Sequence, residues 1–323
     1  MKSKTVFRGP LRKKIDEFIS FRRALGFTMR NTEYVYAEFD NYLAKNQPGM
    51  TIVTRQMLID YLSTTTHLHS TSRGYRVTLI RGLCRYLYQQ DPRHYVPEPK
   101  LIIYGKRKLV PHIYSKRQIN SIINKLQKGP KKKISTMTHS TAVALLSVTG
   151  LRVGEVCRLS IADVDFKNQL LYIQRSKFFK SRIVPISRST VAALILYKQT
   201  RVGYYRTTDA TAPFFVGAFG GRLHEVAVGR KFRHAVRDLK IYTNQGTRPR
   251  LHDLRHTFAT RSLEQVYQSG RDPEASLPAL ATYLGHVNLD YTQTYLHPSI
   301  ELLRSAGERF SNYSNTARNG IKV

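Results

Sequence analysis

The chain has 323 residues and carries 53 Lys and Arg against 21 Asp and Glu, which gives a formal net charge of +32 at pH 7. Such strong self-repulsion is tolerated mainly when the partner is a polyanion, so nucleic acid is the favoured partner. The sequence has no apolar run of membrane-spanning length, no secretory segment after MKSKTVFRGP and no acylation motif, which argues against a membrane protein and favours a cytoplasmic one. The two cysteines, Cys84 and Cys157, lack CxxC spacing, which argues against a disulfide framework and a zinc site.

Residues 1–95 are predicted to form a helical unit. The stretch LRKKIDEFISFRRALGF has the pattern of a basic amphipathic helix, and a second helix is expected after a cap at Asn31 or Thr32. Apolar residues recur at helical spacing in two places, which indicates two core-facing stripes: Val35, Phe39 and Leu43, and then Ile80, Leu83, Cys84 and Leu87.

Four arginines in the last of these helices avoid its apolar stripe: Arg73, Arg76, Arg81 and Arg85. No carboxylates are interleaved with them, so the helix could present guanidinium groups to phosphates or base edges. A solvated charged face is the alternative interpretation.

Residues 96–114 are predicted to be a linker between two domains. The stretch DPRHYVPEPKLIIYGKRKLVPH contains four prolines and a basic cluster, Lys106, Arg107 and Lys108. An extended basic connector could follow a phosphate backbone while the two domains close around a rod-shaped ligand, although it could also be a plain tether.

Residues 115–323 are predicted to be a second, mainly helical domain. Ser115 is a good N-cap for the helix KRQINSIINKLQK. Residues 169–187, QLLYIQRSKFFKSRIVPIS, alternate like two strands around a basic turn. The expected fold class is therefore mainly α, with a small antiparallel β-sheet in the second domain.

Signatures of nucleotide or metal chemistry are absent from the sequence, and the basic residues set in patterned segments are the remaining candidates for chemistry. Arg152 lies between apolar residues, where it needs an anion or a partner, and Glu155 could be that partner. His252 and Arg255 share one helical face, with His256 one turn beyond His252. A metal is disfavoured there because Asp253 lies on another face.

The stretch LGHVNLDYTQTYLH raises the question of what Tyr295, the later of its two tyrosines, does. Gly285 is typical of a helix end, Asn288 of the N-cap of a new helix, and Tyr295 should lie about two turns into that helix. Taken alone, such a tyrosine is ordinarily a packing residue.

Four segments in this order resemble the catalytic motifs of the tyrosine recombinase (phage integrase) family: TGLRVGEVCRL, RSKFFKSRIVPI, LHDLRHTFATRS and LGHVNLDYTQTYLH. The resemblance covers about residues 115–297, and the helical half is similar to the family's core-binding domain. FRRALGF is similar to transposon-borne members. The positions that match the family's catalytic residues are Arg152, Lys177, His252, Arg255, His286 and Tyr295.

The resemblance implies a site-specific DNA recombinase or integrase. It implies that Tyr295 forms a 3′-phosphotyrosyl link with DNA, and that a homotetramer exchanges strands between two duplexes with inverted core repeats through a Holliday junction, in which accessory proteins can take part. Two guanidinium groups and a histidine can hold the transition-state charge without a metal, so no cofactor is expected. His252 is the candidate for removing the tyrosine proton, and Lys177 for protonating the leaving 5′-oxygen.

Two alternatives stay open at this point: a type IB topoisomerase-like nicking and closing enzyme, and a DNA-binding protein that does not cleave. One departure from compact relatives is the long stretch LEQVYQSGRDPEASLPAL between Arg255 and His286, which is expected to be an inserted surface loop. The apolar start of the C-terminal segment, at Ile300, Leu302 and Leu303, suits docking on a neighbouring subunit or a frayed terminus equally.

Overall fold

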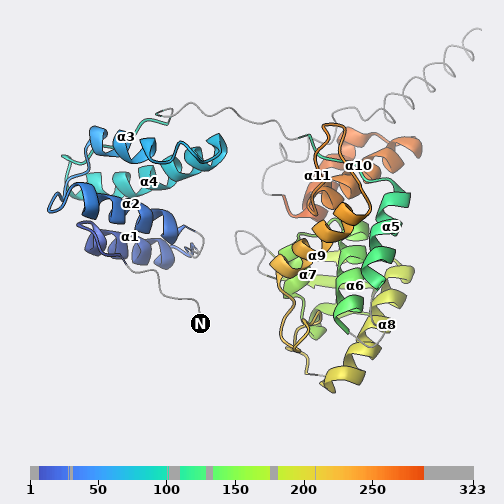
Figure 1. Cartoon of the computed structure of the whole chain (residues 1–323). Helices are drawn as coiled ribbons and strands as arrows, with labels where there is room; N and C mark the ends of the chain where they lie inside the picture. The colour runs from blue at the N-terminus through green and yellow to red at the C-terminus, as the bar shows by residue number, and fades with distance from the viewer. Residues whose placement is uncertain are drawn as a thin grey trace, which may run out of the picture. The chain divides into compact units, whose positions relative to one another are not determined.

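The structure is a computed structural model, and it describes residues 7–27, 29, 32–99, 101, 110–128, 134–174, 181–207 and 209–286. The chain divides into two compact units, Met1–Leu109 and Val110–Val323. Figure 1 shows the described elements of both units, and each unit is treated by itself below.

The first unit is helical and has its own apolar core. Its helices are α1 (Arg12–Ala24), α2 (Glu33–Asn46), α3 (Arg55–Ser63) and α4 (Ser70–Gln90). Helices α1 and α2 pack on each other and on α4, and α3 packs on α2. The two stripes expected from the sequence are buried in this core, which therefore forms where the helical periodicity predicts it.

Both ends of the predicted linker pack into the units. At its start, Val96 and Leu101 pack against the first core, next to Tyr95, whose backbone N–H donates to the carbonyl of Val53 at 2.8 Å. At its end, Tyr114 is buried in the second core, and its backbone N–H donates to Oγ1 of Thr257 at 3.0 Å. The described residues at both ends of 96–114 thus pack with the compact units.

The second unit is also mainly helical. Its elements are α5 (Lys116–Gln127), α6 (Ile134–Thr149), α7 (Val153–Arg158), the 3-10 turn η1 (Ile161–Asp163), β1 (Val164–Asp165), β2 (Leu170–Ile173), β3 (Arg182–Pro185), α8 (Arg188–Tyr205), α9 (Glu225–Asp238), α10 (Asp253–Gln268) and α11 (Pro273–Leu284). Ser115 caps α5 as predicted: its Oγ accepts from the backbone N–H of Gln118 at 3.1 Å.

Helix α6 is the centre of the second unit. It packs against α5, α7, α8, α9 and α10, and nine of its 16 residues are buried, as expected for a helix surrounded on most sides. The strands form one antiparallel sheet in the order β1-β2-β3, with Leu171 opposite Val184 and Ile173 opposite Arg182. The predicted mainly α fold with a small antiparallel sheet is confirmed (Figure 1).

The expected surface loop before His286 is wrong. Helix α10 continues to Gln268, and α11 begins at Pro273 with Asp272 as its N-cap, so most of this stretch is helical. Proline is well tolerated at the first helical position, because its missing N–H needs no partner there. A Gly-, Pro- and Asp-containing stretch therefore resembles a loop although it joins two helices through a short turn.

Candidate active site

Arg152 follows the end of α6 and is the N-cap residue of α7. Gly150 makes the turn between the two helices with a φ of +60°, and an added Cβ there would lie 2.5 Å from the Phe258 ring. The backbone N–H of Arg152 donates to Oε2 of Glu155 at 2.9 Å, and its Nη1 donates to Oε1 at 3.0 Å. The ion pair considered from the sequence is therefore present, but 29% of the Arg152 side chain stays exposed, so the guanidinium keeps a face for a ligand.

His252 and Arg255 lie at the start of α10. His252 is the N-cap residue of this helix, and Arg255 lies in its first turn, where its side chain is buried. Nη1 of Arg255 donates to the carbonyl of Gly150 at 2.8 Å, and its Nη2 donates to the carbonyl of Leu284 at 2.7 Å. Arg255 thus joins the end of α6 to the end of α11.

Asp253 has a structural role in this segment. Its carboxylate accepts from the backbone N–H of Arg250 at 2.8 Å and from Nη2 of the same residue at 2.6 Å. This carboxylate is therefore engaged with Arg250, next to the histidines.

His286 follows the last turn of α11. Gly285 ends that helix in the left-handed conformation, with φ +71°, as its sequence context predicts. The backbone N–H of His286 donates to the carbonyl of Ala281 at 2.9 Å, which turns the chain back over the helix end. This places the His286 side chain within the electrostatic influence of Arg255 and Arg152.

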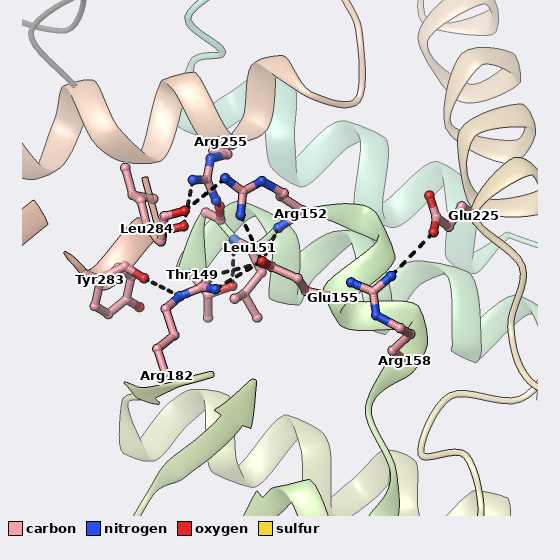
Figure 2. A network of polar contacts seen from close by, with 12 residues as sticks. Thr149, Leu151, Arg152, Glu155, Arg158, Arg182, Glu225, Arg255, Tyr283 and Leu284 are labelled. Atoms are coloured by element: carbon pink, nitrogen blue, oxygen red, sulfur yellow. Dashed lines mark hydrogen bonds and ion pairs between the residues drawn. The ribbon is translucent and has the colours of Figure 1, made fainter. Parts of the chain in front are cut away.

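Three successive carbonyls at the end of α11 each accept a hydrogen bond from a different arginine. Arg182 reaches the carbonyl of Tyr283, Arg255 that of Leu284, and Arg152 that of Gly285, over distances of 2.7, 2.7 and 3.1 Å. Figure 2 shows Arg182 and Arg255 directed at their carbonyls from different elements. Carbonyls at a helix C-terminus lack helical partners and carry partial negative charge, so cations are well suited to them.

Arg182 is a site residue that the sequence analysis did not single out. It begins β3 and makes an ion pair with Glu155, which also pairs with Arg152. In the sequence, Arg182 looks like any arginine in a strand whose residues alternate between buried and exposed positions. Its partner Glu155 lies 27 residues earlier, so no local pattern indicates the contact.

The histidines of this cluster are held in their neutral form near pH 7. Removal from water, followed by the positive charge of Arg255 and then Arg152, lowers the pKa of His286 to about 4. Desolvation and the charge of Arg255 also lower the pKa of His252, although its ring keeps an exposed face. A neutral imidazole can accept a proton, which is the property that a general base needs.

Two of the predicted catalytic residues, Lys177 and Tyr295, lie outside the described residues, as do Lys106, Arg107 and Lys108. The structure brings the other four, Arg152, His252, Arg255 and His286, to one place where the ends of α6 and α11 meet the starts of α7 and α10. A cavity of about 250 Å³ next to them is lined by His252, Arg255 and apolar side chains that include Leu146 and Leu151.

The predicted nucleic-acid-binding arginines of α4 do not form one uniform face. Arg76 is 8% exposed, and its Nη2 donates to Oε2 of Glu38 at 2.7 Å, so the expectation that it faces a ligand does not fit its surroundings. Arg73 and Arg81 are half-buried and donate to the carbonyls of Leu62 and Pro97, whereas Arg85 is exposed. The periodicity places Arg76 off the apolar stripe, but the Glu38 carboxylate of α2 draws it into the helix interface.

Among the described residues, no group of three or more His, Cys, Asp or Glu side chains could hold a metal ion. No helix in the same part of the chain is long and apolar enough to span a bilayer.

Comparison with known proteins identifies the family. The sequence pattern of the phage integrase family matches residues 113–301, close to the range over which the motifs resemble it. A Sinorhizobium fredii protein named as an integrase/recombinase, y4rB, is 34% identical over 303 residues, covering 92% of this chain and 96% of that protein. The tyrosine recombinase XerC of Pelobacter propionicus is 28% identical, covering 74% of this chain and 72% of XerC. The chain belongs to the phage integrase family, which supports a recombinase enzyme.

Solved structures agree with this family at the level of the fold. The XerH site-specific recombinase bound to a palindromic difH substrate matches with a TM-score of 0.63 and 19% identity, over 86% of this chain and 80% of XerH. The Tn1549 transposon integrase in complex with circular intermediate DNA matches with a TM-score of 0.59 and 20% identity, over 92% of this chain and 99% of that one.

Proposed function

We propose that this protein is a site-specific DNA recombinase that cleaves and rejoins DNA through a covalent 3′-phosphotyrosyl intermediate at Tyr295. The observation that carries the proposal is the convergence of Arg152, His252 with Arg255, and His286 from three separated segments on one partly open site. Two guanidinium groups beside neutral imidazoles suit a phosphodiester, whose charge rises in the five-coordinate transition state.

Each residue of this site has a distinct proposed role. Arg152 and Arg255 stabilise the non-bridging oxygens of the scissile phosphate, and His286 adds a hydrogen bond. Neutral His252 accepts the proton of the Tyr295 hydroxyl, whose ordinary pKa of about 10 makes the free side chain a poor nucleophile. Lys177 protonates the leaving 5′-oxygen. The phosphotyrosyl bond conserves the energy of the cleaved bond, so rejoining needs neither ATP nor another cofactor.

Family membership supports a proposal for the wider reaction. We propose that the first unit is the core-binding domain and that Arg73, Arg81 and Arg85, with Lys106, Arg107 and Lys108, contribute DNA contacts. A homotetramer on two duplexes with inverted core repeats would exchange strands through a Holliday junction, in the cytoplasm where the nucleoid DNA lies. Relatives of the same fold are described as bound to a palindromic site and to a transposon circular intermediate, which supports a mobile-element role.

Trapping of the covalent intermediate tests this proposal. The substrate is a duplex that carries inverted repeats identified by sequencing the DNA on either side of the coding region, and it is nicked near the cleavage position so that the short released strand diffuses away. Wild-type protein should accumulate as a covalent protein–DNA adduct, and Tyr295→Phe should bind the duplex with near-normal affinity and form none.

A second tyrosine in the same segment, Tyr291, supplies the matched control. Tyr291→Phe makes the same chemical change four residues earlier and should still form the adduct. Adduct formation by Tyr295→Phe would disprove the assignment of the nucleophile. Site-independent relaxation of supercoiled plasmid would instead support a topoisomerase, and binding with no adduct from wild-type protein would support a non-cleaving DNA-binding protein.

A further inference from the structure

Arg182 lies at the junction between the sheet and the candidate active site. It is the first residue of β3, opposite Ile173 of β2, and its side chain is 10% exposed. Residues 169–187, which the sequence analysis interpreted as two strands around a basic turn, include both Arg182 and Lys177. Arg182 therefore belongs to the same hairpin segment as the proposed general acid.

The guanidinium of Arg182 makes three directed hydrogen bonds. Nη1 and Nη2 donate to Oε1 and Oε2 of Glu155 at 3.0 and 2.9 Å, and Nε donates to the carbonyl of Tyr283 at 2.7 Å. Figure 2 shows Glu155 between Arg182 and Arg152, with Tyr283 on the far side of Arg182. A planar fork of donors is needed for this arrangement, which arginine supplies and lysine does not.

Glu155 is the point where the two arginines meet. Its side chain is 1% exposed, and each carboxylate oxygen accepts two hydrogen bonds, one from Arg152 and one from Arg182. Burial by itself would raise the pKa of Glu155, but the hydrogen bonds and charge of Arg182, followed by those of Arg152, outweigh it and lower the pKa. Glu155 is therefore a buried anion with two cationic partners.

The charge balance of this group bears on phosphate binding. Arg152, Glu155 and Arg182 together carry a net charge of +1, whereas Arg152 and Glu155 without Arg182 would be neutral. A buried carboxylate with Arg152 as its sole cationic partner would compete with a phosphate for that guanidinium. Arg182 satisfies Glu155 and so leaves the positive charge of Arg152 available on its exposed side.

Arg182 also fixes the end of α11. Its side chain lies against Gly285, where an added Cβ would be 2.7 Å from Nη1. Because Gly285 directly precedes His286, the hydrogen bond to the Tyr283 carbonyl and this close contact hold the backbone that carries His286.

We propose that Arg182 is a positioning residue for DNA cleavage: it neutralises Glu155, which keeps the charge of Arg152 available for the scissile phosphate, and it holds the α11 end that carries His286. This inference rests on the proposed function, because it assigns the phosphate to the exposed side of Arg152. It gives Arg182 no contact with DNA, so the residue acts through Arg152 and His286.

Single-turnover cleavage of the nicked duplex at saturating protein tests the proposal, with DNA affinity and thermal unfolding measured for every variant. Arg182→Gln should cleave roughly 10- to 100-fold more slowly, by analogy with the loss of groups that orient the ligands of metal sites, while its DNA affinity changes little. Arg182→Lys keeps the charge but not the fork, so its cleavage rate should lie between those of Arg182→Gln and wild type.

Combining Arg182→Gln with Glu155→Gln distinguishes charge neutralisation from simple bracing. The double variant removes the competing carboxylate and retains amide groups that can hydrogen-bond, so it should cleave at least about threefold faster than Arg182→Gln alone, a coupling expected between groups in direct contact. A residue that only braced the fold would give a double variant no faster than Arg182→Gln.

Arg158 provides a matched control, because it makes an ion pair with Glu225 at 3.9 Å and 51% of its side chain is exposed. Arg158→Gln removes the same charge a short distance away (Figure 2) and should cleave at close to the wild-type rate.

The proposal is overturned if Arg182→Gln cleaves like Arg158→Gln or if the double variant shows no recovery. If Arg182→Gln does not fold, Arg182→Lys takes its place, and the proposal is overturned if Arg182→Lys cleaves as fast as Arg158→Gln. Absence of any adduct from wild-type protein would overturn the proposed function itself, and this inference with it, whereas an adduct from wild type with unaffected Arg182 variants overturns this inference alone.

Discussion

Replacing Gly285 by alanine is expected to damage the second unit at one defined contact. Gly285 has a φ of +71°, and Gly246, which lies in an exposed turn, has a φ of +73°. An added Cβ at Gly285 would lie 2.7 Å from Nη1 of Arg182, whereas nothing lies within 4 Å of a Cβ added at Gly246. The two substitutions therefore impose the same backbone conformation on alanine and differ in their neighbours.

The expected losses follow from these two surroundings. The left-handed conformation costs alanine about 1 kcal/mol, and this is the whole effect expected for Gly246→Ala. Gly285→Ala adds the displacement of Arg182, and weakening its charged hydrogen bonds costs about 1.5–3 kcal/mol more. For a unit of this size, roughly 3 °C of melting temperature is lost per kcal/mol, so Gly285→Ala should melt about 8–12 °C lower and Gly246→Ala about 3 °C lower.

Thermal unfolding followed by circular dichroism measures both losses, and single-turnover cleavage measures the consequence for the site. Gly285→Ala should also cleave more slowly, because Arg182 and His286 move together with the end of α11. Equal melting temperatures for the two variants would refute the reasoning, since the contact with Arg182 would then have no energetic weight.

Three further predictions concern charged groups of the site. The pKa of His286 is lowered to about 4 from an unfolded value of about 6.5, so the unfolded state binds more protons between these two pH values. The free energy of unfolding should therefore decrease as pH falls from 6.5 toward 4. Urea unfolding of His286→Gln should show a weaker decrease. A substrate with sulfur at the bridging 5′ position has a leaving group that hardly needs a proton, so it should restore cleavage by Lys177→Ala but not by Arg152→Ala or Arg255→Ala. Lys180→Ala should lose mainly DNA affinity. If the sulfur substrate rescues Lys180→Ala alone, Lys180 is the general acid instead of Lys177. Arg255→Gln should lose about 2–4 kcal/mol of stability because it leaves two buried carbonyls without their donor. Arg152→Gln should lose less than about 1 kcal/mol of stability because Arg182 still satisfies Glu155. Equal losses in urea unfolding would contradict this difference in burial.

The elements that the sequence predicts well are those with a strong local signal. Ser115 caps α5 as its position before the helix predicts, and Gly285 ends α11 where a left-handed residue is needed. The alternation around the basic turn predicts β2 and β3, because residues of a strand with one buried face alternate in polarity. In each case the deciding interaction lies within a few residues along the chain.

The misses involve contacts between distant segments. Arg76 avoids the apolar stripe of its own helix, yet Glu38 of α2 pairs with it across the interface. Arg182 looks like any strand arginine until Glu155 and the Tyr283 carbonyl are brought to it from elements 27 and 101 residues away. A local pattern carries no information about such partners, so a surface charge and a buried positioning charge look alike in the sequence.

The two arginines proposed to bind the phosphate are held in different ways, and this difference follows from where each one starts. Arg255 extends from the first turn of α10 into the interior and is 3% exposed, because it must reach both the Gly150 and the Leu284 carbonyls. Arg152 starts at the N-cap of α7 and retains an exposed face, because Glu155 has a second cationic partner in Arg182. Arg255 is thus held mainly by the fold, whereas Arg152 is held mainly by a balance of charges. A phosphate arriving at the site therefore meets one guanidinium fixed by packing and another whose available charge depends on a third arginine.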